Sequence, residues 1–73
     1  PPPRERKLWL RLKTLDERVM RRIELLCEMF PGRERMIIFA EDTGRRMGAE
    51  CLIHPSLVEE LGRMLGGENV VVK

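Results

Sequence analysis

Catalysis and metal binding depend on a small set of side-chain groups, and this 73-residue chain contains few of them. His54 is the sole histidine of the sequence. No serine or cysteine nucleophile with an orienting acid stands at a recognisable spacing from it. His54 instead directly precedes Pro55, which is typical of a loop residue that shapes the start of the following helix. The sequence therefore predicts no catalytic residue.

Metal, cofactor and phosphate sites are likewise not predicted. Metal ions need several converging ligands, and one histidine with two separated cysteines provides no such spacing. Glu41 and Asp42 lack the alternating carboxylates of a calcium-binding loop, and turn chemistry explains them better. A phosphate-binding loop places its glycines before a helix, whereas both glycine clusters here follow predicted helices. We therefore expect no cofactor and no small-molecule substrate.

The two cysteines, Cys27 and Cys51, are too few for a disulfide framework. Each lies among apolar neighbours, which favours a reduced core residue over a disulfide or a redox pair. No secretion signal is recognisable, and the longest apolar runs, such as "MIIFA", are too short to cross a bilayer. These features predict a cytoplasmic protein without a membrane partner.

Positive charge is concentrated in the first half of the chain. Residues 1–35 carry ten Lys and Arg against six Asp and Glu, a net +4, whereas residues 36–73 carry four against six, a net −2. A basic side could weakly attract nucleic acid or an acidic partner. Many of the arginines stand one helical turn from a glutamate, however, which favours a solvated face whose charges neutralise each other.

Trp9 is the one aromatic residue that the sequence places outside a predicted core stripe. It lies beside Arg11 and Lys13 on the outward face of a predicted strand. Binding of single-stranded nucleic acid requires several aromatic side chains along a basic groove, and only Phe30 and Phe39 accompany Trp9. Trp9 is thus either a stacking platform or a side chain covered by a neighbouring domain, and the second interpretation is preferred.

Three segments in the first half of the chain have a regular periodicity. "KLWLRLK" at 7–13 alternates leucine with other residues, which predicts a strand with one covered face. "TLDE" at 14–17 predicts a helix with a threonine N-cap, which Pro31 ends together with Gly32, where glycine tolerates a left-handed turn. "RMIIFA" at 35–40 predicts a central strand. The apolar stripe of the helix comprises Val19, Ile23, Leu26, Cys27 and Phe30.

The second half of the chain adds a hairpin, a helix and a final strand. "EDTG" at 41–44 is a predicted turn whose glycine suits a positive φ. Residues 45–53 would form the returning strand, in which Gly48 indicates a bulge or a frayed stretch. Ser56 is the predicted N-cap of the second helix, and a glycine pair stops that helix before a strand at 69–73.

The order strand, helix, strand, strand, helix, strand predicts an α/β (α+β) fold. Crossover connections of this kind give a two-layer sandwich, a four-stranded mixed sheet with two helices packed on one face. A split β-α-β arrangement is one candidate, since periodicity does not determine strand order. Residues 1–6, which begin with "PPP", are interpreted as a linker or a cloning remnant, and residues 7–73 as a single small domain.

Several of these segments together resemble the C-terminal segment of the alpha subunit of bacterial DNA polymerase III, a replicative polymerase. "KLWLRL" is followed by a helix, by "FPG" at 30–32, by a strand and by a "TGRR"-like turn. The similarity extends to "HPSLVEELGRMLGGENVVVK" at 54–73 and covers nearly the whole chain after the prolines. Its most specific residues are Phe30, Pro31, Gly32, Leu61, Leu65, Gly66, Asn69, Val70 and Val71.

This resemblance implies a non-catalytic C-terminal accessory domain that follows the OB-fold domain of a DNA-directed DNA polymerase, a nucleotidyltransferase. In that family the polymerase acids and their magnesium lie far upstream. The C-terminal region is associated with contacts to the tau subunit of the clamp loader. We therefore expect protein contacts in the replisome during DNA replication. Binding of single-stranded DNA, or purely structural packing on the OB-fold domain, is the alternative. The face expected to meet a partner is formed by Trp9, Arg11, Arg18 and Arg22.

Overall fold

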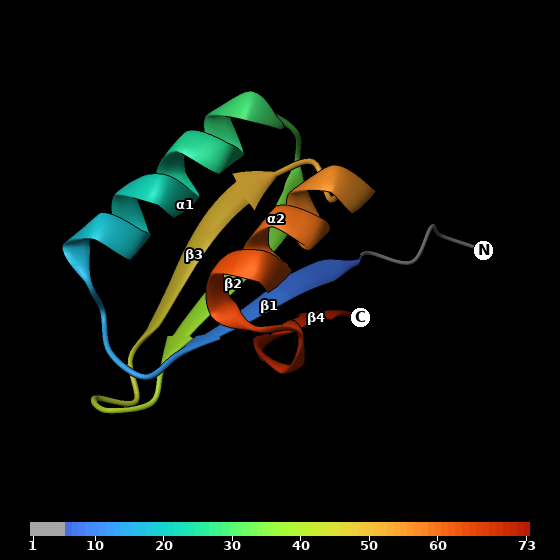
Figure 1. The fold of residues 1–73 in the computed structure, drawn as a ribbon. Helices are drawn as coiled ribbons and strands as arrows, with labels where there is room; N and C mark the ends of the chain where they lie inside the picture. Colours follow the sequence, from blue (N-terminus) through green and yellow to red (C-terminus); the bar gives the residue numbers. More distant parts are fainter. Residues whose placement is uncertain (1–5) are drawn as a thin grey trace.

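The computed structural model describes residues 6–73 and shows the predicted order of elements (Figure 1). In chain order these are strand β1 (Lys7–Leu12), helix α1 (Glu17–Met29), strand β2 (Glu34–Ala40), strand β3 (Arg46–Cys51), helix α2 (Pro55–Leu65), the short 3-10 helix η1 (Gly67–Asn69) and strand β4 (Val70–Val72). The predicted α+β fold with a four-stranded mixed sheet and two helices is confirmed. The segment interpreted as a linker or remnant falls, at residues 1–5, outside the described residues.

The four strands form one sheet in the order β3-β2-β1-β4. β1 pairs in parallel with β2, so that Leu8 lies opposite Met36. β4 pairs with β1, and β3 with β2, in the antiparallel direction. The split β-α-β candidate is therefore wrong, because no strand lies between β1 and β2. The short turn after β2 places β3 beside β2 at one edge of the sheet, and β4 lies beside β1 at the opposite edge.

Both helices cover the same face of the sheet, as Figure 1 shows. Leu8, Leu10 and Leu12 alternate along β1 toward that face and are almost completely buried, as the period of two predicted. The core cluster that they form with the other strands and the helices also contains Ile23, Leu26, Met36, Ile38, Cys51, Ile53, Leu57 and Leu61. The hydrophobic core thus lies entirely between the sheet and the two helices.

Helix α1 begins later than the capping box predicted. Its N-cap is Asp16, whose Oδ1 accepts a hydrogen bond of 2.8 Å from the backbone N–H of Arg18. The prediction of Thr14 as the N-cap was wrong, because a carboxylate is a stronger acceptor than a hydroxyl for the N–H groups of a helix start. At the other end, the backbone N–H of Phe30 donates to the carbonyl of Leu26 and ends the helix.

Helix α2 begins at Pro55, one residue before the predicted N-cap Ser56. The N-cap is His54, whose Nδ1 accepts from the backbone N–H of Ser56 at 3.0 Å, and the fixed φ of proline suits the first helical position. The imidazole also stacks on the ring of Phe30, with centroids 5.4 Å apart. The interpretation of His54 as a residue that shapes the start of the helix is confirmed. His54 also ties the end of α1 to the start of α2.

Gly32 allows two chain segments to approach each other closely. A Cβ atom at this position would lie 2.8 Å from the backbone Cα and N of Leu52. The φ of Gly32 is not positive, so the left-handed turn predicted there was wrong, and close approach is the reason for the glycine. Gly44 does have the positive φ predicted for it, 69°. Gly48 lies in unbroken register with Ile37, so the predicted bulge was wrong as well.

Glu34 joins three segments at the start of β2. Its Oε2 accepts from Nε of Arg6 at 3.0 Å, and its Oε1 accepts from Nη2 of Arg6 at 3.1 Å. Oε1 also accepts from the backbone N–H of Ile53 at 3.0 Å. The bond from Arg6, followed by the one from Ile53, lowers the pKa of the Glu34 carboxyl. Glu34 thereby holds together the residue before β1, the start of β2 and the segment before α2.

Both cysteines are free thiols, as predicted. Cys51 is buried at the end of β3, and Cys27 is half-buried in α1. Burial, with smaller contributions from Cys27 and Glu34, raises the pKa of Cys51 to about 11. Burial also raises the pKa of Cys27. Both thiols are therefore protonated and poorly nucleophilic at neutral pH.

Replacement of Gly32 tests whether its close approach to the backbone of Leu52 requires a glycine. Gly32→Ala should lower the free energy of unfolding by about 1–3 kcal/mol, because the atoms that its Cβ would meet belong to the backbone of Leu52. Gly48→Ala is the matched control, since a Cβ there would meet no atom within 4 Å. It should stabilise the domain by about 0.4–1 kcal/mol by restricting the unfolded chain. Urea denaturation measures both changes, and equal effects would contradict the explanation.

The hydrogen bonds of Glu34 predict a pH dependence of stability. A carboxyl whose pKa is lower in the folded state stabilises the fold above its unfolded pKa, and loses this contribution as the pH falls through the folded pKa. Glu34→Gln should therefore destabilise the domain near neutral pH. The difference from the unchanged chain should shrink as the pH falls below the ordinary value of 4.5.

Urea denaturation at about pH 7 and about pH 3 measures this difference. Arg6→Gln is the companion variant, because it keeps Glu34 but removes the main cause of its lowered pKa. The stability of this variant should depend less on pH than that of the unchanged chain. A destabilisation by Glu34→Gln that is the same at both pH values would show that the ion pair does not stabilise the fold.

Candidate functional site

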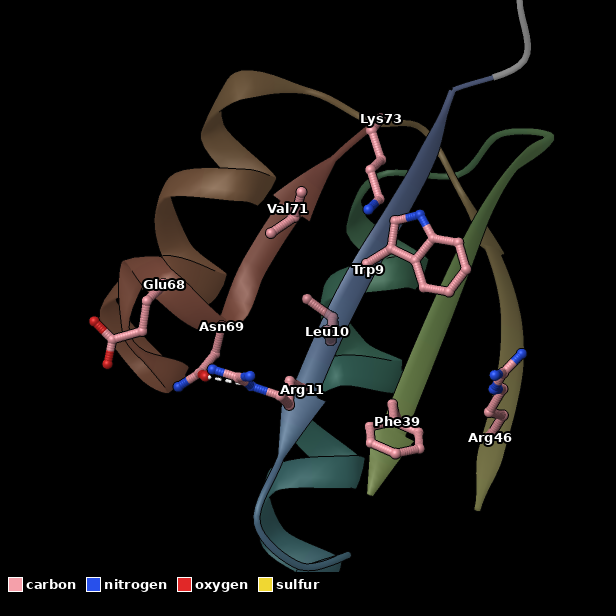
Figure 2. Close-up of a pocket in the computed structure, with 9 residues that line it drawn as sticks. All are labelled: Trp9, Leu10, Arg11, Phe39, Arg46, Glu68, Asn69, Val71 and Lys73. Carbon is pink, nitrogen blue, oxygen red and sulfur yellow. Dashed lines mark hydrogen bonds between the residues drawn. The ribbon is translucent and has the colours of Figure 1, made fainter. Parts of the chain in front are cut away.

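The sheet face that the two helices leave uncovered is called the open face below. Strand alternation and register assign one set of side chains from each strand to it. These are Lys7, Trp9 and Arg11 of β1, Arg35, Ile37 and Phe39 of β2, Arg46, Gly48 and Glu50 of β3, Val71 of β4, and Lys73 after it. Figure 2 shows several of them in front of the sheet, with the helices behind.

A pocket of about 310 Å³ lies on this open face (Figure 2). Its lining comes from all four strands and from η1, and it combines aromatic, cationic and amide side chains. The polar and aromatic members are Trp9, Arg11, Phe39, Arg46, Asn69 and Lys73, together with one acid, Glu68. The sheet therefore assembles in one place residues that lie far apart in the sequence.

Trp9 is half-buried at the centre of this arrangement. It lies opposite Ile37 on β2 and opposite Val71 on β4. The Nζ atom of Lys73 lies 5.9 Å from the centroid of the indole ring, within the range of a cation–π interaction. The Nε1 atom of Trp9 is buried and has no hydrogen-bond partner among residues 6–73. Trp9 thus presents an aromatic surface together with an unsatisfied donor.

Arg11 is held at one side of the pocket by two neighbours. Its Nε donates to Oδ1 of Asn69 at 3.1 Å and lies 3.2 Å from Oε1 of Glu41. Asn69 is itself fixed, because its Nδ2 donates to the carbonyl of Leu65 at the end of α2. Arg11 therefore has a defined position, and part of its charge is already neutralised.

A second candidate surface lies on the other side of the molecule, between α1 and α2. This helix groove has a cavity volume of about 620 Å³ and is lined by Arg18, Arg21, Arg22, Leu25, Leu26, Met29, Phe30, Ser56 and Glu60. Nη2 of Arg22 lies 3.9 Å from Oε1 of Glu60, so a weak ion pair connects the two helices. Leu25 and Met29 leave 53% and 70% of their surfaces exposed, which is high for large apolar side chains.

The helical spacing explains why these apolar residues are exposed. The predicted stripe of α1 turns Ile23 and Leu26 into the core, where both are buried. Arg18, Arg22, Leu25 and Met29 follow one another at steps of four, three and four and form a second stripe beside the first. This spacing was the signal that could have revealed Leu25 and Met29, which the sequence interpretation did not single out.

The four residues expected to form one binding face are divided between the two surfaces. Trp9 and Arg11 lie on the open face, whereas Arg18 and Arg22 line the helix groove behind the sheet. The structure therefore does not bring them together, because α1 covers the leucine side of β1 and not the tryptophan side. Their role in binding a partner stays a prediction, now for two separate surfaces.

Phe39, Arg46 and Lys73 belong to the open face but were missed as site residues. Phe39 was assigned to the core, which was wrong, since β2 is covered on one face only and Phe39 is half-buried on the other. The continuous apolar run of β2 conceals the alternation that places Arg35 and Phe39 on the same face. Lys13, expected beside Trp9, lies beyond the end of β1.

Within residues 6–73, no three His, Cys, Asp or Glu side chains are grouped so that they could hold a metal ion. None of the helices in this described range is long and apolar enough to cross a membrane.

The open face and the helix groove are the two candidate surfaces considered for binding a partner. The first combines aromatic and cationic groups, and the second combines exposed apolar side chains with arginines. Comparisons of the chain with protein-family models, with curated proteins and with solved structures found no match.

Proposed function

We propose that the chain is a non-catalytic module of a bacterial replicative DNA polymerase and that it works by protein contact in the replisome. The observation that carries this proposal is the helix groove, where Leu25 and Met29 expose apolar surface beside Arg18 and Arg22. Contiguous exposed apolar side chains at a groove are typical of protein interaction sites. The helix groove is therefore the proposed docking site.

The composition of the groove indicates the chemistry of its partner. Complete burial of an exposed side chain of this kind contributes about 1.5–3 kcal/mol. Leu25 and Met29 are 53% and 70% exposed, so each would contribute the corresponding part of that range. The arginines would pair with carboxylates and would speed association more than they would strengthen it. Arg22 already lies 3.9 Å from Glu60, and a carboxylate of an acidic partner can take the place of Glu60 in this weak ion pair. The partner that fits is an amphipathic segment with apolar anchors and acidic flanks.

The resemblance to the C-terminal segment of the DNA polymerase III alpha subunit supports the cellular setting of this proposal. Several residues that carry it have structural roles here. Phe30 stacks on His54, Gly66 ends α2 with a φ of 95°, and Asn69 donates to the carbonyl of Leu65 at 2.6 Å. These contacts hold the ends of the helices that form the groove. In this proposal the parent protein is a cytoplasmic DNA-directed DNA polymerase, and the tau subunit of the clamp loader is the partner.

Variants of the helix groove test the docking role. Leu25→Gln removes apolar surface, and Leu25→Glu also adds a charge that repels an acidic partner. Each should weaken binding of tau by at least about tenfold, or 1.4 kcal/mol, with Leu25→Glu the more severe. Biolayer interferometry with the immobilised chain measures the affinity. Since the Leu25 side chain is more than half exposed, the melting temperature should change little.

Arg46→Gln is the matched control, because it removes a charge from the open face and should leave tau binding unchanged. If tau does not bind, but the preceding OB-fold domain binds and Leu25→Glu abolishes that contact, the groove has a structural role within one polymerase. Tau binding that is insensitive to both Leu25 variants would contradict docking at the groove.

A further inference from the structure

We propose that the open face of the sheet binds single-stranded DNA, with bases stacked on Trp9 and Phe39 and phosphates placed near Arg35, Arg46 and Lys73. This surface is separate from the helix groove and would be a second site of the same module. The choice of DNA over RNA rests on the proposed function as a polymerase module. The stacking surface and its charge do not depend on that function.

The charge of the open face is the first observation in favour of a polyanion. Its strand side chains include five cations, Lys7, Arg11, Arg35, Arg46 and Lys73, against one anion, Glu50. Two further anions lie at its border, because Glu68 lines the pocket and Glu41 pairs with Arg11. With all three anions counted, the face carries a formal +2, as much as the whole chain. Positive charge gathered on one face attracts the phosphate backbone of nucleic acids independently of sequence.

Most of these cations are available to phosphates. Among residues 6–73 the ion pairs of the structure involve Arg6, Arg11, Arg22 and Arg63, and only Arg11 belongs to the open face. Arg35 and Arg46 are exposed at opposite ends of the face and make no ion pair within this range. Lys73 is exposed and lies over the indole ring at 5.9 Å. A phosphate near these groups would gain charge-assisted hydrogen bonds without breaking existing ones.

The aromatic side chains have an arrangement suited to stacking. Trp9 lies opposite Ile37, two residues before Phe39, so the two aromatic residues are diagonal neighbours on adjacent strands. Figure 2 shows both rings on the front of the sheet. Open four-stranded sheets that bind single strands stack two or three bases on aromatic residues of adjacent strands. Such stacking is tolerant of sequence, because every base has a π-face.

Gly48 leaves room for a nucleotide halfway along β3, the edge strand of the open face. It lies on β3 opposite Ile37, and a Cβ atom added there would meet nothing within 4 Å. A nucleotide stacked on Trp9 or Phe39 could therefore approach the backbone of β3 without a steric barrier. Because Gly48 has no side chain, the backbone of β3 is uncovered between the side chains of Arg46 and Glu50.

The indole N–H of Trp9 is a further reason to expect a ligand rich in acceptors. Its Nε1 is buried and lacks a partner in the described part of the chain. Polar groups in such a position are normally satisfied, and phosphates and bases supply the oxygen acceptors that the surrounding lysine and arginines do not. Movement of the Lys73 side chain toward a phosphate would uncover the ring at the same time.

Unpaired bases are required by this geometry. The open face presents its aromatic rings on the surface of a sheet, whereas the bases of a duplex are stacked on each other and are not available to those rings. Double-stranded DNA would reach only the cations. The open face should therefore bind single-stranded DNA more tightly than double-stranded DNA. A face that served only to bind an acidic protein would have no reason to show this preference.

The 73-residue chain should be titrated with an oligothymidylate of about twelve nucleotides at low salt. Trp9 is the only tryptophan, so its fluorescence reports directly from the proposed site. We expect saturable quenching with a dissociation constant below about 100 µM. The logarithm of the association constant should fall with the logarithm of salt concentration, with a slope of about −0.7 for each phosphate contacted. A duplex of equal length should bind at least about tenfold more weakly.

Variants locate the binding on the open face. Phe39→Ala should weaken binding by about tenfold, and Arg46→Gln should weaken it and reduce the salt slope by about 0.7. Arg21→Gln is the matched control, because it removes the same charge from α1 behind the sheet and should change neither value appreciably. Thermal melting checks the fold of each variant. Should Phe39→Ala not fold, the exposed Arg46 still provides the test.

Several results would overturn the inference. These are no quenching at about 100 µM oligonucleotide, duplex binding as tight as that of the single strand, or losses as large for Arg21→Gln as for Arg46→Gln. Tighter binding of the corresponding RNA would overturn the choice of DNA. Leu25→Glu in the helix groove should bind the oligonucleotide like the unchanged chain. Failure of DNA binding therefore leaves docking of tau intact, and failure of docking leaves DNA binding intact.

Discussion

The strict alternation of β1, held between β2 and β4, is the constraint on which the rest of the structure depends. Because both helices cover the side of Leu8, Leu10 and Leu12, the intervening residues have to lie on the uncovered side. Trp9 is therefore excluded from the core although it is the largest apolar side chain of the domain. Because both helices pack on the leucine side of β1, that side carries the helix groove and the other side carries the aromatic and basic open face.

A few side-chain contacts hold the two helices against the leucine side of the sheet. Glu34 binds Arg6 and the backbone of Ile53, and His54 both caps α2 and stacks on Phe30. These contacts meet at the junction where α1 ends and α2 begins. A domain of this size buries a modest share of its surface, so such ties at segment junctions matter for its rigidity. They lie at the ends of the two helices that form the groove.

Much of the fold could be predicted from the sequence, because period-two and helical spacings are local signals. The strand of leucines at 7–13 and the stripe from Val19 to Phe30 fall into this class. Cap positions were wrong because Asp16 and His54 lie within two residues of Thr14 and Ser56, and the capping-box spacing favoured the latter two. Strand order depends on pairing between distant segments, which no local pattern contains.

The candidate surfaces were less predictable than the elements that form them. Trp9 and Arg11 were found because β1 has a clear alternation, whereas the unbroken apolar run of β2 concealed Phe39. Arg46 and Lys73 reach the same face only through the pairing of β3 and β4 with the central strands. On α1, charge alone pointed to Arg18 and Arg22, and their apolar companions became visible only once the core side of the helix was known.

The pairing between the first and last described strands has a mechanical consequence. Lys7 and Lys73 exchange two backbone hydrogen bonds, of 2.9 and 3.0 Å, so β1 starts and β4 ends at the same corner of the sheet. Any segment joined before β1 and any segment joined after β4 would meet the domain at that one corner. Two such connections form a single pivot, about which the domain could swing relative to a neighbour without deforming its sheet.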